Sequence, residues 1–161
     1  MNVHRGYLPG CIGRIVELHA SYYATAVGFG LPFETKVASE LAAFCLGYQD
    51  ARDGLWLIRR DGRFEGSIAI DGAHAKQKGA HLRWFIMSPE FQGQGAGNTL
   101  LSAALTFCDD CGYRKVYLWT FDDLHAARHL YEKHGFKLAV TQRGSQWGKE
   151  VNEQLFTRGD A

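Results

Sequence analysis

The chain has 161 residues, of which 46% are hydrophobic and 22% are charged, a balance typical of a folded globular protein and not of a disordered one. Lys and Arg number 18 against 17 Asp and Glu, so the net charge of +1 gives no overall field that would favour nucleic acid or an anionic membrane. We expect residues 1–161 to form a single domain with one hydrophobic core.

The chain start and the apolar runs indicate a compartment. The first residues, MNVHRGYLPGCIGR, lack the apolar stretch of a signal peptide. The longest apolar runs are much shorter than the roughly 18 residues that a membrane-spanning helix needs. We therefore predict a cytoplasmic protein that has neither a nucleic acid nor a membrane as its partner.

The first half of the chain reads as a strand, two helices and a hairpin. Ile12 to Val16 is predicted to be a short strand, followed by a helix that ends at Gly28. A second helix is predicted from about Pro32 to Gly47, with its apolar stripe at Phe33, Val37, Leu41, Phe44 and Cys45. Two apolar strands then meet at Asp61-Gly62, which is a strong two-residue turn signal.

The second half alternates strands and helices. After a polar loop at 71–79, residues 80–88 are predicted to be an interior strand, because their centre is apolar at consecutive positions. A glycine-rich turn opens a helix that runs to about Cys111, and 115–121 is the next strand. A short helix that stops at Gly135 and two final strands, 137–142 and 151–158, complete an α+β fold with a central mixed sheet.

The glycine-rich turn after the strand, QGQGAG, is a candidate anion site. The first amides of a helix have no partner within it, and glycine lets backbone approach a phosphate closely. A turn made only for packing is the alternative. Gly93 is not followed by the lysine of a Walker A loop, and the order Gly93, Gly95, Gly97 is not that of a dinucleotide-binding fingerprint.

Two segments together resemble the GNAT superfamily of acyl-CoA-dependent N-acyltransferases. QGQGAG matches that family's Q/R-x-x-G-x-G/A signature, and AARHLYEKHGF, from Ala126 to Phe136, is similar to its A-x-x-L-Y-x-x-x-G-F helix. The resemblance covers 12–157 and implies the GNAT fold: a twisted mixed sheet of about seven strands with four helices, in the order β-α-α-β-β-β-α-β-α-β-β.

The resemblance implies acetyl-CoA as co-substrate and no metal. The backbone of the signature loop would bind its pyrophosphate, which assigns the cofactor-binding role to Gln92, Gly93, Gln94, Gly95, Ala96, Gly97, Asn98 and Thr99. The pantetheine arm would lie along the preceding strand at Phe85, Ile86 and Met87. A backbone amide of this strand would polarise the thioester carbonyl.

The resemblance also implies catalytic residues. Tyr131 falls on the family's helix tyrosine, which serves the departing thiolate, although it could be an ordinary half-buried aromatic residue. Leu124 stands where many relatives have an asparagine, which puts that pantetheine contact in doubt. His81 is a candidate general base because neighbouring Arg83 would keep its ring neutral; an exposed strand-end histidine is the alternative.

Three residues are candidates for binding the acceptor. Glu34 could hold a cationic amine or be an acid favoured by the helix dipole. Tyr22, or its neighbour Tyr23, and Trp147 could wall an apolar acceptor, although such residues are often core.

Two classes of function therefore stay open. The first is an N-acetyltransferase acting on a small-molecule or protein amine by direct attack, with a homodimer as one assembly. The second is a non-catalytic acyl-CoA sensor, since "LRWF" and "WGKEVNEQLF" also resemble the GNAT halves of MarR-type fusion regulators.

The Cys108–Cys111 pair could suit a redox or metal site, but it continues an apolar helix stripe and lacks a second ligand pair.

Overall fold

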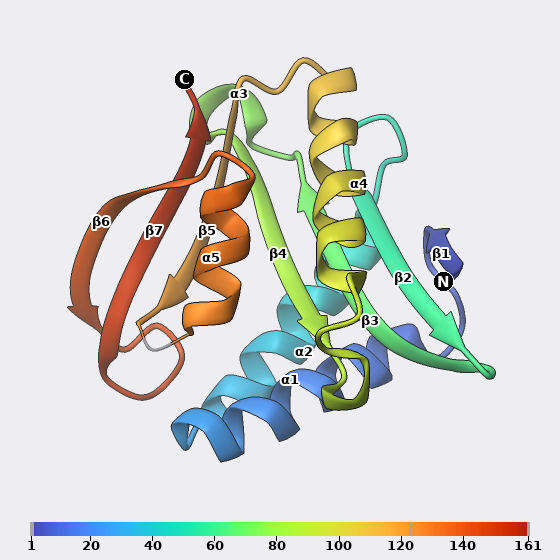
Figure 1. The fold of residues 1–161 in the computed structure, drawn as a ribbon, viewed down its shortest axis with the longest axis vertical. Coiled ribbons are helices and arrows are strands. Elements are labelled where there is room, and N and C mark those ends of the chain that lie inside the picture. The colour runs from blue at the N-terminus through green and yellow to red at the C-terminus, as the bar shows by residue number, and fades with distance from the viewer. Residues whose placement is uncertain (1, 123, 161) are drawn as a thin grey trace.

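The fold is a seven-stranded sheet covered by helices, seen in a computed structural model that describes residues 2–122 and 124–160. The strands lie in the order β1-β2-β3-β4-β5-β7-β6 (Figure 1). They are β1 (Asn2–Arg5), β2 (Gly54–Arg60), β3 (Arg63–Asp71), β4 (Ala80–Met87), β5 (Lys115–Phe121), β6 (Lys137–Gly144) and β7 (Val151–Gly159). The helices are α1 (Cys11–Val27), α2 (Leu31–Leu46), α3 (Ala75–Lys78), α4 (Ala96–Asp110) and α5 (His125–Lys133), with a 3₁₀ turn η1 (Pro89–Phe91).

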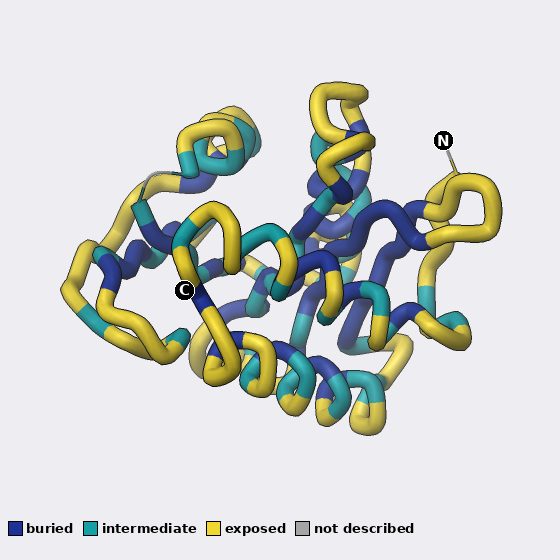
Figure 2. The backbone as a smooth tube through the Cα atoms, turned by 90° about the horizontal axis from the view of Figure 1, so that it is seen from below, coloured by how far each residue is buried: buried dark blue, intermediate teal, exposed yellow. Residues whose placement is uncertain are grey.

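Each face of the sheet has its own apolar core, because strands alternate their side chains between faces. On one face, α1 and α2 pack through residues such as Ile15, Phe33 and Leu41 against Leu57 and Trp84. On the other, α4 and α5 pack through buried side chains against the same strands, among them Leu100, Leu101, Ile68, Leu118 and Phe156. Figure 2 shows the buried stretches concentrated in the central strands, whereas β6 at the sheet edge is largely exposed.

The one parallel pair of the sheet, β4 with β5, separates soon after it forms. The two strands pair only at Ala80↔Val116 and His81↔Tyr117. Beyond His81 they diverge, as Figure 1 shows, while β4 continues to pair with β3 on its other side. The β5-facing edge of β4 therefore has no strand partner over most of its length in the described part of the chain.

A bulge distorts β4 where it diverges. The register with β3 shifts between Ser67 and Ala69, which pair with Ile86 and Arg83. Trp84 lies at this shift with a φ of 47°, in the left-handed region that residues other than glycine rarely adopt. The bulge therefore changes the direction of the backbone immediately before Phe85.

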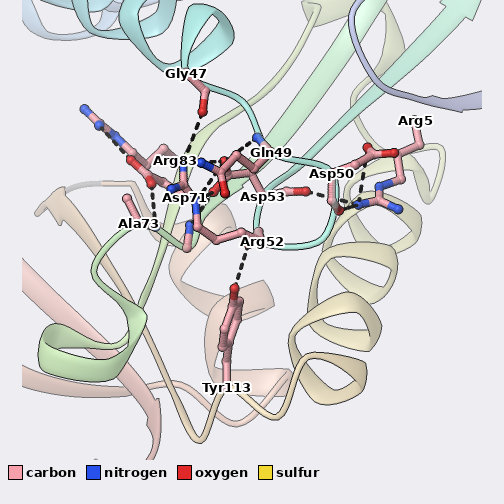
Figure 3. A network of polar contacts seen from close by, with 11 residues as sticks. Arg5, Gly47, Gln49, Asp50, Arg52, Asp53, Asp71, Ala73, Arg83 and Tyr113 are labelled. Atoms are coloured by element: carbon pink, nitrogen blue, oxygen red, sulfur yellow. Dashed lines mark hydrogen bonds and ion pairs between the residues drawn. The ribbon is translucent and has the colours of Figure 1, made fainter.

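A polar network ties the loops at the α3 end of the sheet together (Figure 3). The buried Asp53 carboxylate accepts hydrogen bonds from the Gln49 and Gly72 amides, at 3.0 and 2.9 Å, and pairs with Arg52. Tyr113 donates to the Arg52 carbonyl at 2.7 Å. Because Asp53 holds Gly72, it also fixes the end of β3 at Asp71, whose carboxylate lies 4.0 Å from the Arg83 guanidinium.

The predicted fold class is confirmed, with corrections at the N-terminal end and in one loop. The predicted strand at 12–16 is wrong: these residues belong to α1, and the first strand is β1. The buried positions Cys11, Ile15, Leu18 and His19 follow a helical spacing. Residues 12–16 lie within this spacing and are therefore helical. β1 is exposed throughout, so no alternating pattern marks it.

The loop at 71–79 contains α3, which makes five helices where four were expected. Across the described residues, no helix is long and apolar enough to span a membrane.

Candidate active site

A cavity of about 370 Å³ lies where β4 and β5 separate. Its walls come from both faces of the sheet: α1 and α2 on one side, β4 and β5 in the middle, and Tyr131 of α5 on the other. Trp147, in the loop between β6 and β7, closes one end. The cavity therefore connects the two faces of the sheet at the edge of β4.

The glycine-rich loop, residues 92–97, supplies free backbone amides at the start of α4. Among the described residues, no backbone hydrogen bond is made by the amides from Gly93 to Asn98, and the first amide to bond is that of Thr99, to the Gly95 carbonyl. Gly93 and Gly95 have φ values of 78° and 80°, and a Cβ at either would contact nothing within 4 Å. Partnerless amides, an open approach and the helix dipole are the features that suit an anion.

Three polar side chains of this segment already form hydrogen bonds with other groups of the protein. Gln94 donates to the Glu90 carbonyl at 3.1 Å, and Thr99 donates to the Gly95 carbonyl at 3.1 Å. Asn98 Oδ1 is hydrogen-bonded to His134 Nε2 of α5 at 2.8 Å. An anion at this loop would consequently meet mainly backbone, and side-chain changes here should matter less than changes at the glycines.

Tyr131 lies on α5 with its ring against the diverging strand. It is buried, and its ring centroid is 6.0 Å from that of Phe85 and 5.9 Å from that of Phe136. Its side chain lines the cavity, and no hydrogen bond of its hydroxyl is recorded within 2–122 and 124–160. Burial raises the pKa of this phenol far above its ordinary value, so the hydroxyl stays protonated at neutral pH.

Two neutral imidazoles line the α1/α2 side of the cavity. His81 stacks on Tyr117 with ring centroids 4.5 Å apart, and burial, then the cations Arg83, Lys36 and Lys78, lowers its pKa to about 3. His19 hydrogen-bonds through Nδ1 to the Ile15 carbonyl at 2.8 Å, and burial lowers its pKa to about 4. Arg83 lowers the pKa of His81, as the sequence predicts, but burial lowers that pKa more.

Only some of the residues predicted to bind the acceptor line this cavity. Glu34 is exposed on the first turn of α2 and does not line the cavity. Glu40, about one and two-thirds turns further along α2, does line it, together with Lys36. Trp147 and Tyr23 are also in the lining, whereas Tyr22 lies in a second cavity of about 390 Å³ beside Leu124. His19, Lys36 and Glu40 escaped prediction, because only the packing of α1 and α2 against β4 brings them together.

The two cysteines at the end of α4 are free thiols. Cys108 is completely buried in the α4 core, and burial raises its pKa to about 12. A thiol with so high a pKa is a poor nucleophile and metal ligand. Among the described residues there is no group of three or more His, Cys, Asp or Glu that could hold a metal ion.

The comparisons with known proteins agree with this geometry. Residues 14–136 match the model of the Acetyltransferase (GNAT) family. An uncharacterised N-acetyltransferase of Methanocaldococcus jannaschii is 26% identical over 96 residues, which cover 57% of this chain and 42% of the relative. The chain thus spans less than half the length of that curated relative.

Solved structures give the same fold over nearly the whole chain. A GNAT acetyltransferase from Staphylococcus aureus Mu50 has a TM-score of 0.77 at 15% identity, covering 98% of this chain and 99% of that one. A GNAT acetyltransferase from Elizabethkingia anophelis, solved with acetyl-CoA bound, has a TM-score of 0.68 at 17% identity, covering 99% and 97%.

The divided β4–β5 pair lies beside α4, whose glycine-rich N-terminus has free backbone amides. The chain belongs to the GNAT acetyltransferase family, whose co-substrate is acetyl-CoA. The residues present fit that molecule: partnerless amides at Gly93–Asn98 suit its pyrophosphate, and the unpaired edge of β4 suits an extended amide-bearing arm.

Proposed function

We propose that the protein transfers an acetyl group from acetyl-CoA to the primary amine of a small molecule or protein, by direct attack of the amine. The observation that carries this proposal is the continuity of the cavity. It extends from Phe85 of β4 and Tyr131 of α5 on one face of the sheet to residues of α1 and α2 on the other. Donor and acceptor would thus approach one point of β4 from opposite faces of the sheet.

The binding roles follow from the elements. Acetyl-CoA supplies an activated thioester. The backbone from Gln92 to Gly97, with Asn98 and Thr99 in the first turn, holds its pyrophosphate, and Phe85, Ile86 and Met87 pair with its arm. The bulge at Trp84 turns the next backbone amide toward the reacting carbonyl, where a hydrogen bond stabilises developing negative charge.

The proton transfers would fall to Tyr131 and to the imidazole side of the cavity. As the amine nitrogen bonds to the acetyl carbon and the C–S bond breaks, Tyr131 gives its proton to the leaving thiolate. The N–H of the attacking nitrogen becomes more acidic as the new bond forms, so His81, although its pKa is about 3, can accept that proton directly or through water. Trp147 and Tyr23 wall the acceptor, whereas the exposed Glu34 and the more remote Tyr22 would contact only a long acceptor.

A non-catalytic acyl-CoA sensor is the second candidate. Leu124 replaces the asparagine of many relatives, and neither cavity histidine has a pKa near neutrality, which are the features expected if turnover had been lost. The resemblance to the GNAT halves of MarR-type regulators fits this candidate. For either function, we propose one domain over 1–161, a cytoplasmic location, and a homodimer through the last strands as an assembly to test.

Calorimetric titration with acetyl-CoA, followed by a thiol-release assay over a panel of amines, tests the proposal. Binding with thiol release on any amine supports the enzyme. Binding without release across the panel supports the sensor. Absence of binding would contradict the role given to 92–97.

A further inference from the structure

Glu40, the carboxylate of the cavity lining, is already paired with two cations. Glu40 accepts a hydrogen bond from Lys36 Nζ at 2.6 Å and a second one from Arg83. Asp71, the other acid near Arg83, lies 4.0 Å from it and is not part of the cavity lining. Within the described ranges, the lining therefore offers no unpaired carboxylate to a cationic acceptor.

The cations of the same lining have donors to spare. Arg83 has one recorded hydrogen bond in the described part of the chain, through a single guanidinium nitrogen to Glu40. Its guanidinium stacks on Trp84 at 4.2 Å from the ring centroid, and its side chain is 20% exposed. Stacking fixes the plane of the guanidinium while its remaining N–H groups stay available. The paired N–H groups of a guanidinium match the two oxygens of a carboxylate.

The charged side chains of the cavity lining are mostly positive. Among the described residues they are Lys36, Arg83 and the single carboxylate Glu40. Asp71, which lies 4.0 Å from Arg83, is outside the lining. Burial, and then Arg83, Lys36 and Lys78, lowers the pKa of His81 in the same cavity. A second positive charge on the acceptor, as in a polyamine, would be repelled here, whereas a negative group would be attracted.

The opposite part of the cavity is aromatic. Tyr23 and Phe33 have ring centroids 5.4 Å apart, and Phe121 and Trp147 also lie 5.4 Å apart, each pair edge to face. All four side chains line the cavity. They form a continuous apolar wall that would favour a flat hydrophobic group.

We propose that the acceptor is an amine with a carboxylate on the adjacent carbon and an apolar, preferably aromatic, side chain, in which Arg83 and Lys36 bind the carboxylate. Arg83 is two residues before Phe85 on β4, so a carboxylate held there keeps the neighbouring amine beside the thioester position. This inference rests on the proposed function, of which it names the substrate class.

A matched pair of ligands tests it. L-phenylalanine and 2-phenylethylamine differ by the carboxylate alone. We expect L-phenylalanine to bind at least about tenfold more tightly by calorimetry in the presence of CoA, and to show a similar advantage in kcat/KM, since a charge-assisted hydrogen bond is worth about that much. Spermidine, as a polycation, should bind more weakly than either.

Two variants identify the residues responsible. Arg83→Gln should remove most of the preference for L-phenylalanine while acetyl-CoA affinity stays within about twofold, because the glycine-rich loop is on the other face. Lys36→Met, on the surface of α2, should reduce the preference less and serves if Arg83→Gln does not fold. Arg59→Gln is the control, since this arginine also stacks on an aromatic ring, Phe64 at 5.4 Å, but lies outside the cavity.

The outcomes separate the two proposals. Equal or better binding of 2-phenylethylamine or spermidine would overturn the carboxylate inference, whatever the turnover. Tighter binding of L-phenylalanine that disappears in Arg83→Gln and persists in Arg59→Gln supports it. If such selective binding occurs with no thiol release, the site stands and the transferase proposal fails.

Discussion

The Ser67 hydroxyl donates a 2.7 Å hydrogen bond to the Trp84 carbonyl across the β3–β4 bulge. Both residues are buried, and the bond occupies a carbonyl that the interrupted ladder leaves without its regular partner. A side chain of β3 thus holds β4 in the left-handed turn that precedes Phe85. The position of Phe85 in the cavity wall therefore depends on a contact from Ser67, which lies outside the lining.

Replacing Ser67 by Ala should therefore destabilise the fold by about 1–3 kcal/mol, because a buried carbonyl loses its partner. Acetyl-CoA affinity should fall as well, since the bulge is free to relax. Urea unfolding and calorimetry measure the two effects. Ser39→Ala is the matched control: its hydroxyl donates to the Thr35 carbonyl on the exposed side of α2, and we expect a change within about 0.5 kcal/mol. Equal effects of the two substitutions would contradict the role of Ser67.

A Cβ in the glycine-rich loop should weaken binding of acetyl-CoA. Gly95→Ala should cost about 1 kcal/mol of stability, because φ is positive there, and should weaken binding about tenfold by displacing the amides. Gly62→Ala, at the hairpin turn with φ of 76° and equally open space, should cost similar stability and leave binding unchanged. Gln92→Ala and Gln94→Ala should also leave binding nearly unchanged, since backbone provides the site.

Comparable losses of affinity in Gly95→Ala and Gln94→Ala would show that side chains, and not amides, hold the pyrophosphate. A loss in Gly62→Ala would point to a general effect of destabilisation instead. Calorimetry at one temperature, with the folded fraction checked by circular dichroism, distinguishes these results.

The parts of the fold that local chemistry determines could be predicted from the sequence. The hairpin at Asp61-Gly62, α2 and α4 were found because turn residues and an apolar stripe each leave a mark within a few residues. β1 left none, since every one of its residues is exposed and its partner β2 is some 50 positions away. Edge strands of this kind are held by the sheet and not by their own pattern.

The acceptor side of the site was harder to predict for the same reason. Glu34 and Glu40 are six residues apart on α2, about 240° around the helix, so only one of them can face the cavity. The sequence does not say which face of α2 meets β4, and the predicted Glu34 lies on the exposed side. His19 and Lys36 likewise reach the cavity only through long-range packing. By contrast, His81 and Arg83 alternate on one strand, and both line the cavity as that spacing indicates.

Tyr131→Phe should separate chemistry from binding. If the phenol protonates the thiolate, its loss should lower kcat by about a hundredfold or more, while acetyl-CoA affinity stays the same. Stability should hardly change, because no hydrogen bond of the hydroxyl is recorded across the described residues. Tyr117→Phe is the control: this tyrosine lines the cavity and stacks on His81, but has no proposed proton to give. A normal kcat in Tyr131→Phe would transfer the acid role to water.

The buried imidazoles should make the fold sensitive to mild acid. His19 and His81 have pKa values lowered from 6.5 to about 4 and about 3 in the folded state. Above about pH 7.5 both are neutral in the folded and the unfolded state and contribute no pH dependence. Below pH 6.5 the unfolded chain takes up protons that the folded chain does not, so stability falls as pH falls, until the folded pKa values are reached. Each histidine can contribute up to about 1.4 kcal/mol per pH unit.

Urea unfolding between pH 6.5 and 5.5 measures this slope, because carboxylates such as Glu40, whose pKa is lowered from 4.5 in the folded state, begin to contribute below that range. His81→Gln should reduce the slope by up to the amount that one proton contributes. Adding His19→Gln should reduce the slope further. The partly buried His134, whose pKa is also lowered by burial, accounts for a remainder. A slope that is unchanged in His81→Gln would mean that this imidazole reaches water readily in the folded protein. It would then also be a stronger base than its burial suggests, which would strengthen its proposed part in accepting the amine proton.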